Sequence, residues 1–434
     1  MTKEYKAMEL YEAYLRHPYI STDSRQTTQG TLFFALRGDS FDGNRYAASA
    51  LEAGAAAAVL DNPEIYETLP EEQRSRCYLV PDTLEALQQL AAHHRRQLGI
   101  PIFAITGSNG KTTTKELTYR VLSCRFHTYA THGNLNNHIG VPLTLLSMDR
   151  STEFGLVEMG ASHCGEIALL SSIAQPDFGL ITNIGKAHLE GFGGEEGVMR
   201  GKGELLDYLH SHKGTAFYLQ QSEALCQMVA ERNGIEAIPY STADLKLVGN
   251  DHQFLTVSWH GHKIRTHLVG EYNLFNLAAA IAVGCYFDIP EPEIVAAIES
   301  YLPENNRSQR QATQRNTLIL DAYNANPSSM EAALRHFISE PSMQPKAVIL
   351  GDMLELGSYS AQEHRKIVQL LQEVEMPEVY LVGAHFSEAG ADCYPTFPDA
   401  DTLRTYLTGH PLNNRLILIK GSRGIHLERL TDLL

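Results

Sequence analysis

The sequence predicts an α/β protein of three domains, and three observations support this fold class. The length of 434 residues is enough for about three domains of ordinary size. Short apolar runs alternate with helical patterns, which is typical of parallel sheets covered by helices. In the middle and last parts of the chain, the apolar runs end in polar, glycine-containing turns. Ligands of parallel sheets bind at such strand ends, so the fold class also indicates where a site should lie.

Composition and charge narrow the class of protein and partner. The chain is 43% hydrophobic and 20% charged, as expected of a globular soluble protein. A net charge of −16 argues against a general nucleic-acid binder, but a nucleotide needs only one local positive pocket. Six scattered cysteines without a CxxC pair predict reduced thiols in a cytoplasmic protein. The chain starts without a signal-peptide core, and no apolar run approaches the ~20 residues of a membrane span.

The first predicted domain is a small α/β unit over residues 1–98. Leu84, Leu87 and Leu90 share one face of its last helix, and Gly99 follows the end of that helix. The expected elements are a helix, three strands and a helix, in the order 8–15, 31–36, 55–60, 77–80 and 83–98.

The second predicted domain, residues 99–302, begins with the segment around which the chain is organised. In IFAITGSNGKTTT, residues 102–114, an apolar strand leads through a glycine loop into a helix that is expected to extend to residue 126. Such a loop turns backbone N–H groups toward an anion, and the helix adds its positive end. Lys111 would reach the β- and γ-phosphates of a nucleotide, and Thr112 would hold Mg²⁺. Ile105 stands where the standard phosphate loop has its first glycine, so the pattern is the shorter TGxxGKT.

Polar groups follow the next two strands of this domain. Strand 154–158 ends on Glu158, and strand 178–182 is followed by Asn183 and His188. These groups should meet the phosphate loop at the carboxyl edge of one mostly parallel sheet of the P-loop type. Glu158 is the strongest candidate for a Mg²⁺ ligand, since carboxylate oxygens suit a hard cation. The plain alternatives are a hydrated loop carboxylate and a structural histidine.

The remainder of the second domain begins with a predicted hairpin. Apolar and polar residues alternate there with a period of two, which predicts strands 254–259 and 264–269. The helix that begins after Gly270 carries Asn273 and Asn276 on one face. Before this hairpin, the segment RGKGE that contains Lys202 is expected to start a helix or to form a turn.

The third predicted domain, residues 303–434, is a second mostly parallel, Rossmann-like sheet. Helical stretches separate its strands, which is the pattern of a βαβ series. Because the strands end in polar turns, we expect a ligand face here as well. The expected strands are 317–320, 347–350, 379–382 and 416–419.

Several segments spread along the chain form one recognisable set of motifs. In chain order, they are TGSNGKTTTKE (106–116), GNLNNHIGVPLTLL (133–146), VEMGASHCGEI (157–167), TNIGKAHLEGFGG (182–194), GEYNLFNLAAA (270–280), DAYNANPSSMEAAL (321–334), GDMLELG (351–357) and KGSRG (420–424). Together they resemble the Mur ligases, a family of ATP-dependent enzymes of peptidoglycan synthesis. The shorter phosphate loop of that family accounts for the absent first glycine. The asparagine-rich loop, NANPSSM and GDMLELG favour the members that add D-alanyl-D-alanine over their sister ligases.

The resemblance implies a ligase that joins D-Ala-D-Ala to a UDP-MurNAc-tripeptide. ATP would phosphorylate the terminal carboxylate of the peptide, and the amine of the dipeptide would attack the acyl phosphate. The enzyme would neutralise phosphate charge and align the amine. The implied cofactors are ATP and two Mg²⁺ ions, with Lys202 matching a lysine that family members carbamylate. A UDP-sugar domain, an ATP-binding ligase domain and a C-terminal domain are implied, in a monomer that binds no nucleic acid.

The same resemblance implies roles for individual residues. The catalytic residues would be Lys111, Glu158, His188 and Lys202, and the metal ligands Thr112, Glu158, His188 and Lys202. The nucleotide contacts would be Gly107, Ser108, Asn109, Gly110, Lys111, Thr112, Thr113, Asn273, Asn276, Arg307 and Asp321. The substrate contacts would be Ser24, Arg25 and Asn44 for the UDP-sugar, with Asn134, Asn136, Asn137, Tyr323, Asn324, Asn326, Lys420, Ser422 and Arg423.

The residues alone leave three other hypotheses about the function open. A folylpolyglutamate-type ligase shares the central domain, but the full first domain with its STDSR segment argues against it. A P-loop nucleotide switch would need an (N/T)KxD tetrapeptide, and the nearest match, GKAH at 185–188, lacks the aspartate. A non-enzymatic scaffold would leave Glu158, His188 and the polar strand ends unexplained.

Overall fold

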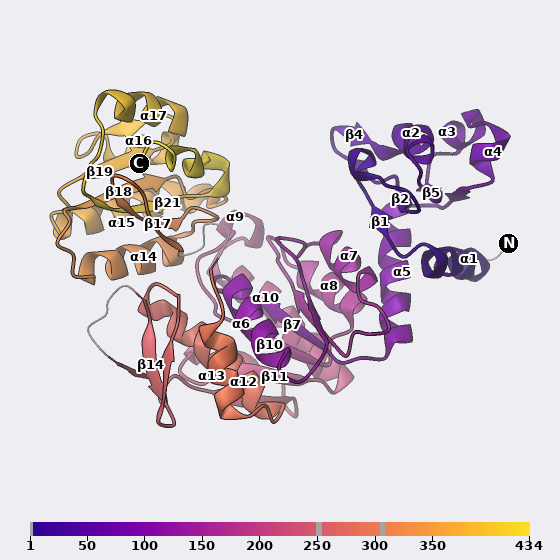
Figure 1. The fold of residues 1–434 in the computed structure, drawn as a ribbon, viewed down its shortest axis with the longest axis horizontal. Coiled ribbons are helices and arrows are strands. Elements are labelled where there is room, and N and C mark those ends of the chain that lie inside the picture. Colours follow the sequence, from indigo (N-terminus) through magenta and orange to yellow (C-terminus); the bar gives the residue numbers. More distant parts are fainter. Residues whose placement is uncertain (1–2, 249–253, 304–308) are drawn as a thin grey trace.

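The computed structural model describes residues 3–248, 254–303 and 309–434. Three sheet-based domains follow one another along the chain (Figure 1). The N-terminal and C-terminal domains lie apart, on either side of the central domain. The expected α/β class with mostly parallel sheets is confirmed, while the boundaries at 98/99 and 302/303 stay predictions. None of the described helices combines the length and the apolar character needed to cross a membrane.

The N-terminal domain is built around a parallel sheet with two separate cores. Because alternate strand residues point to opposite faces, Phe34 and Val59 pack on the side of Leu87, while Phe33 and Ala58 belong to another core. The strands, in spatial order, are β1 (Ile20–Ser21), β2 (Leu32–Phe34), β5 (Ala57–Leu60) and β6 (Cys77–Leu79), and β3 (Arg37–Gly38) pairs with β4 (Phe41–Asp42). The helices are α1 (Lys3–Arg16), η1 (Ser24–Gln26), η2 (Gly43–Tyr46), α2 (Ala47–Glu52), α3 (Pro63–Thr68), α4 (Glu71–Arg74) and α5 (Thr83–Leu98).

Helix α5 joins this domain to the next, and its bounds are those predicted. The Asp82 carboxylate caps its start by accepting the N–H of Glu85 at 2.7 Å. Its end is Gly99, whose φ of 64° lies in the left-handed region that favours glycine. In Figure 1 the helix runs from the N-terminal sheet down to the central domain, so its two capped ends lie at the two sides of this connection.

The central domain holds a six-stranded, all-parallel sheet. β7 lies between β9 and β10, so the polar residues that follow those two strands flank the phosphate loop. The strands, in spatial order, are β12 (Glu236–Tyr240), β11 (Thr215–Leu219), β10 (Phe178–Ile181), β7 (Ile102–Thr106), β9 (Phe154–Glu158) and β8 (Thr128–Ala130). The helices are α6 (Lys111–Leu122), α7 (Gly140–Leu146), α8 (Glu166–Ala174), α9 (Leu189–Phe192), α10 (Glu195–His212), α11 (Glu223–Ala230), η3 (Glu271–Asn273), α12 (Leu274–Tyr286) and α13 (Glu291–Glu299).

The central domain differs from the predictions in several details: strands β8, β11 and β12 were not predicted, and α6 ends at Leu122 and not at residue 126. The predicted hairpin is part of a three-stranded antiparallel sheet of β13 (Lys246–Leu247), β14 (Thr256–Trp259) and β15 (His262–Arg265). Its second strand begins earlier than expected, because a tight turn at His260-Gly261 sets the register. Lys202 lies inside α10, where Gly201 is required because a Cβ there would stand 2.4 Å from the Phe192 ring.

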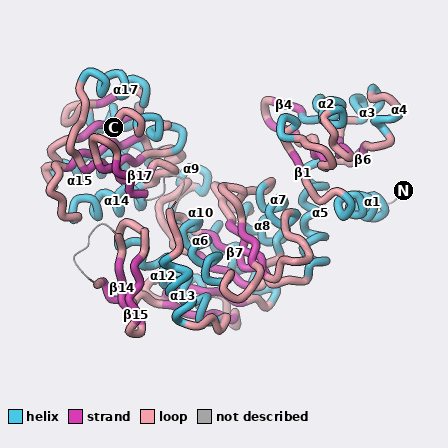
Figure 2. Tube along the Cα trace, viewed as in Figure 1, coloured by secondary structure: helices cyan, strands magenta, loops and turns pink. Residues whose placement is uncertain are grey.

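The C-terminal domain contains the second large sheet, which is parallel except for one edge strand. All four predicted strands are present, and β16 adds the antiparallel edge. The strands, in spatial order, are β16 (Gln309–Ala312), β17 (Thr317–Asp321), β21 (Leu416–Lys420), β18 (Lys346–Gly351), β19 (Val379–Val382) and β20 (Thr396–Phe397). The helices are α14 (Pro327–Ser339), η4 (Gly357–Tyr359), α15 (Ser360–Glu373), α16 (Ala384–Gly390), α17 (Ala400–Gly409), η5 (Arg423–Ile425) and η6 (Leu427–Leu430). Figure 2 shows the helices on the outside of this sheet.

Candidate active site

A cleft of about 1080 Å³ separates the central and C-terminal domains. The carboxyl ends of β7, β9 and β10 line one side, and the carboxyl ends of β17 and β21 with the segment after β17 line the other. Most predicted nucleotide and metal residues lie on its wall. The predicted residues that line the cleft are Ser108, Asn109, Gly110, Lys111, Thr112, Thr113, Asn136, Asn137, Glu158, His188, Asn273, Asn276, Asp321, Tyr323, Asn324, Asn326 and Lys420.

The phosphate loop connects β7 to α6 in the predicted way. Gly110 has a φ of 78°, and a Cβ added there would stand 2.4 Å from the side-chain oxygen of Asn276. The Lys111 Nζ folds back over the loop and donates to the carbonyl oxygens of Gly107 at 2.7 Å and Ser108 at 3.1 Å. The loop therefore combines a positive charge with a helix start, whose first N–H groups have no acceptor within the helix. Both features fit a phosphate group.

Glu158 is a buried carboxylate tied directly to the phosphate loop. Glu158 is only 1% exposed, and its Oε2 accepts a hydrogen bond from the Thr112 hydroxyl at 2.8 Å. Its Oε1 accepts the side-chain amide of Asn136 at 2.8 Å, and its N–H donates to Thr131 Oγ1 at 3.0 Å. The threonine hydroxyl and the carboxylate are hard oxygen donors of the kind that Mg²⁺ takes, so the donor set fits that ion.

His188 enters the cleft from the loop after β10. Its φ of 53° is left-handed, and its Nδ1 forms an ion-pair contact with Glu355 of the C-terminal domain. The contact with the His188 imidazole lowers the pKa of the Glu355 carboxyl below its usual range, against the opposing effect of desolvation. The predicted metal ligand therefore has a partner across the cleft.

Lys202 is buried just outside the cleft wall. The residue is 1% exposed, its Nζ donates to the carbonyl of Ala161 at 3.1 Å, and the Nζ lies 5.1 Å from the centroid of the Phe192 ring. Burial lowers the pKa of Lys202 well below its ordinary value, and the positive charge of Lys111 lowers it further. Among the described residues, no three His, Cys, Asp or Glu side chains gather as a ready metal cluster. The predicted second Mg²⁺ site with Glu158 and His188 therefore stays a prediction.

The C-terminal side of the cleft carries a buried ion pair. Asp321 and Lys420 end neighbouring strands in register, and the Lys420 ammonium contacts the Asp321 carboxylate. The Lys420 side chain is fully enclosed, so this pair is part of the cleft wall and not a surface contact. Arg423 lies outside the cleft lining, with its guanidinium 5.7 Å from the centroid of the Tyr323 ring.

Hydrogen bonds join the phosphate loop and the loop after β10 to the C-terminal domain. The Asn326 Nδ2 donates to the Asn109 Oδ1 at 2.7 Å, while the Asn326 Oδ1 accepts the Ser329 N–H and caps α14. The N–H of Lys186 donates to the hydroxyl of Ser328 at 3.1 Å. Asn326 is a predicted substrate contact, and its side-chain amide already donates to Asn109 of the central domain.

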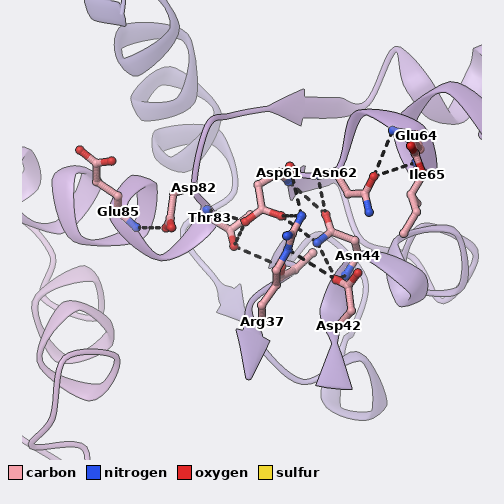
Figure 3. Close-up of polar contacts among 11 residues, drawn as sticks. Arg37, Asp42, Asn44, Asp61, Asn62, Glu64, Ile65, Asp82, Thr83 and Glu85 are labelled. Atoms are coloured by element: carbon pink, nitrogen blue, oxygen red, sulfur yellow. Dashed lines mark hydrogen bonds and ion pairs between the residues drawn. The ribbon is translucent and has the colours of Figure 1, made fainter. Parts of the chain in front are cut away.

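The predicted UDP-sugar residues lie in the N-terminal domain, away from the cleft. Asn44 is fully buried, and all its amide groups are used inside that domain (Figure 3). Its Nδ2 donates to Asp42 and Asp61, and its Oδ1 accepts the N–H groups of Asp61 and Asn62. The structure thus gives this side chain an internal role, and its contact with the sugar stays a prediction. Ser24 and Arg25 lie on η1, where Arg25 is exposed and pairs with Asp23 at 2.8 Å.

Other predicted residues lie outside the cleft or outside the described residues. Asn134 and Gly107 do not line the cleft, and Ser422 is buried against the backbone of Ala325 and Leu354. Arg307 lies outside the described residues. Sequence reasoning missed the aromatic residues Tyr272 and Phe275 and the acid Glu355 among the lining residues, although the GEYNLFN and GDMLELG segments contained them.

Comparison with known families agrees with this arrangement along the whole chain. Three family models match: "Mur ligase family, catalytic domain" at residues 18–95, "Mur ligase middle domain" at 105–284, and "Mur ligase, glutamate ligase domain" at 306–423. The UDP-N-acetylmuramoyl-tripeptide–D-alanyl-D-alanine ligase of Bacillus subtilis is 34% identical, over 99% of this chain and 95% of the relative. The enzyme of that name from Escherichia coli is 31% identical, over 97% and 94%.

Solved structures agree with these sequence matches. MurF from Acinetobacter baumannii superposes with a TM-score of 0.85 at 30% identity, covering 98% of this chain and 97% of that one. The MurF ligase from Thermotoga maritima in complex with ADP has a TM-score of 0.83 at 24% identity, over 96% and 97%, and shows the shared fold. By its full-length relatives, its domain matches and its fold, the chain belongs to the Mur ligase family.

Proposed function

We propose that the chain is an ATP-dependent amide ligase that joins D-Ala-D-Ala to a UDP-MurNAc-tripeptide and so forms the UDP-MurNAc-pentapeptide precursor of peptidoglycan. The observation that carries the proposal is the direct bond between the phosphate loop and a buried carboxylate, Thr112 to Glu158, inside a cleft between two domains. The relatives that match nearly the whole chain are named for this reaction.

The reaction needs activation because a carboxylate is a poor electrophile. A carboxylate oxygen of the tripeptide attacks the γ-phosphorus of ATP, and the bond from that phosphorus to the β-phosphate oxygen breaks. The amine of the dipeptide then attacks the acyl carbon and loses a proton, the carbon–oxygen bond breaks, and inorganic phosphate leaves. Lys111 and the start of α6 would hold the phosphates, and the cleft would align the amine with the acyl carbon.

Thr112 and Glu158 would hold one Mg²⁺, which neutralises phosphate charge when bound. In the structure, the Thr112 hydroxyl donates to Glu158 Oε2 at 2.8 Å, so the two oxygens lie close enough together to serve the same ion. His188 would serve a second Mg²⁺ from the adjacent loop. On the nucleotide side, Asn273 and Asn276 would lie near the adenine, and Asp321 near the ribose or phosphates.

Lys202 would act as a carbamate. Its buried amine has a lowered pKa, which favours the neutral nucleophile that adds to CO₂. Addition of the Nζ to the CO₂ carbon, with loss of a proton, turns the side chain into an anion. That charge would then face the positive Lys111 and the metal, in place of an ammonium that both would repel.

The substrates would be shared among the three domains. Ser24 and Arg25 would face the UDP-sugar, and Tyr323, Asn324 and Arg423 would face the dipeptide. Because these residues lie on different domains, closure of the domains would assemble the complete site. We propose a monomer with domain boundaries at 98/99 and 302/303.

Phosphate release with the full set of substrates tests the proposal. The chain is mixed with ATP, Mg²⁺, UDP-MurNAc-tripeptide and D-Ala-D-Ala, and inorganic phosphate and the pentapeptide product are measured. We expect both to appear only when all four components are present. Equal phosphate release without the dipeptide would show an ATPase and would rule the ligase out.

A further inference from the structure

The loop after β18, GDMLELG at 351–357, is anchored at three successive residues. The carboxylate of Asp352 accepts the N–H groups of His385 at 2.9 Å and Phe386 at 2.8 Å, at the start of α16. Asp352 is itself buried, so these bonds fix the beginning of the loop inside the C-terminal domain.

The next two residues are fixed through their backbone. The N–H of Met353 donates to Nε2 of the fully buried His364 at 3.0 Å, and the N–H of Leu354 donates to the hydroxyl of Ser422 at 2.9 Å. The residue that follows, Glu355, has a left-handed φ of 62° and a side chain that is 60% exposed. A rigid support therefore presents one acidic side chain to the cleft, which Glu355 lines.

Glu355 meets the central domain at two points. Its carbonyl oxygen accepts the N–H of Glu190 at 3.2 Å, and its carboxylate contacts Nδ1 of His188. A Cβ added at Gly357 would stand 3.1 Å from the Glu190 side chain, so the two segments are in close contact. The loop is thus seated directly on the segment that carries the predicted metal ligand.

The segment of His188 also reaches back to the phosphate loop. The N–H of Ser108 donates to the carbonyl of Asn183 at 3.0 Å, and the N–H of Gly185 donates to the Ser108 hydroxyl at 2.9 Å. Residues 183–188 therefore connect the phosphate loop, at one end, with Glu355 of the C-terminal domain, at the other.

An imidazole has two nitrogens, and a partner on one decides the tautomer and orientation of the other. Metal-ligating histidines donate their second N–H to a carboxylate or carbonyl, and such partners change metal affinity by about 10- to 100-fold. We propose that Glu355 is a positioning residue: by holding Nδ1 of His188, it directs Nε2 toward the divalent cation of the cleft. This inference rests on the proposed function, which gives His188 a metal.

A positioning role of Glu355 has a consequence that a simple interdomain contact would not have. Because Glu355 belongs to the C-terminal domain and His188 to the central domain, cation affinity would depend on the two domains being in contact. The same interface contains a second ion pair, Lys186 to Glu363 at 3.0 Å, which does not touch His188. That pair supplies a matched control for the loss of an interdomain contact alone.

The test is a titration of the full chain with Mn²⁺ in the presence of ADP, with free Mn²⁺ followed by electron paramagnetic resonance. We expect Glu355→Ala to weaken Mn²⁺ binding at least about tenfold. Glu355→Gln should lose less, because its amide oxygen still accepts from Nδ1. Glu363→Ala should leave the Mn²⁺ affinity within about twofold, as expected for an ion pair remote from the metal. Thermal unfolding of each variant verifies that the fold is intact.

His188→Ala separates failure of this inference from failure of the proposed function. If His188→Ala weakens Mn²⁺ binding and Glu355→Ala does not, the positioning role is wrong while the metal site stands. An equal loss in Glu363→Ala and Glu355→Ala would also overturn it, because docking alone would then explain the effect. If His188→Ala binds Mn²⁺ like the unaltered chain, the metal role that the proposed function gives to His188 is wrong, and the inference falls with it.

Discussion

The central domain meets its two neighbours through interfaces of different kinds. Toward the N-terminal domain, buried side chains bond to backbone carbonyls: Tyr14 donates to Leu146 at 2.7 Å, and His94 bonds the carbonyl of Met148 at 2.8 Å. Toward the C-terminal domain, side chains of the cleft itself make the contacts, such as Asn109 with Asn326. The residues of the first interface lie outside the cleft lining, whereas Asn109 and Asn326 of the second also line the cleft.

The largest effect should come from the centre of the cleft. Lys111→Ala removes the ammonium that lies over the phosphate loop, and we expect activity to fall at least about 100-fold, the scale of losing one preorganised electrostatic group. Phosphate release with all substrates measures it. Because Lys111 does not take part in the N-terminal interface, the midpoint of thermal unfolding should stay unchanged. Near-normal kinetics would contradict the role given to the loop.

Lys202→Ala should be almost as damaging, for a different reason. The buried side chain would lose the anion that a carbamate provides, so we expect activity to be lost and then partly restored by added short carboxylic acids. Rescue curves with formate and acetate measure this, and chloride at equal ionic strength is the control. Full activity of the variant without any additive would remove the carbamate from the proposal.

A variant of the N-terminal interface should affect stability and leave nucleotide binding alone. Arg95 is buried, donates to the carbonyl of Ala174 at 3.0 Å and pairs with Asp177 at 2.8 Å. Arg95→Ala should lower the free energy of unfolding by about 2 kcal/mol, since buried carbonyl acceptors lose their donor. Urea unfolding measures the change, and ADP affinity should remain the same. A changed ADP affinity would show that this interface also shapes the cleft.

The smallest effect should be a pH dependence at the same interface. Burial lowers the pKa of His94 below its ordinary value of 6.5, so the unfolded chain binds a proton that the folded chain resists. The contribution of His94 to the free energy of unfolding is fully present above pH 6.5. It is lost as the pH falls from the pKa of His94 in the unfolded chain to its lower pKa in the folded chain. His94→Gln should therefore show a shallower loss of thermal stability from pH 8 to pH 5.5 than the unaltered chain. Parallel slopes would contradict this.

The sequence predicts best those elements whose signals are local. Helix α5 has its cap, its leucine face and its final glycine within the segment, and β9 ends on Glu158 as predicted. The strands β11 and β12 were missed, and β12 contains Pro239, which an edge strand tolerates because its outer side has no neighbour. Their position follows from the sheet as a whole and not from their own residues.

The residues of the site differ in the same way in how well the sequence predicts them. The phosphate loop, Glu158 and Asn276 follow from motifs that fold locally or lie at the ends of neighbouring strands. Asn44 could not be distinguished from a surface asparagine, because its burial depends on Asp61 from a distant strand end. Glu355 was missed because its partner lies on another domain, and no local pattern encodes how two domains are oriented.

The strand order of the C-terminal sheet has a consequence for biosynthesis. β21 comes after the other five strands of this sheet in the sequence, yet it lies between β17 and β18. A growing chain that has reached residue 415 therefore has two open strand edges where its central strand belongs, and such edges invite pairing with other chains. Lys420, at the end of β21, is among the last groups of the cleft to leave the ribosome. A nascent chain thus completes its sheet and its cleft in one late step, and stalling before that step leaves it most exposed to aggregation.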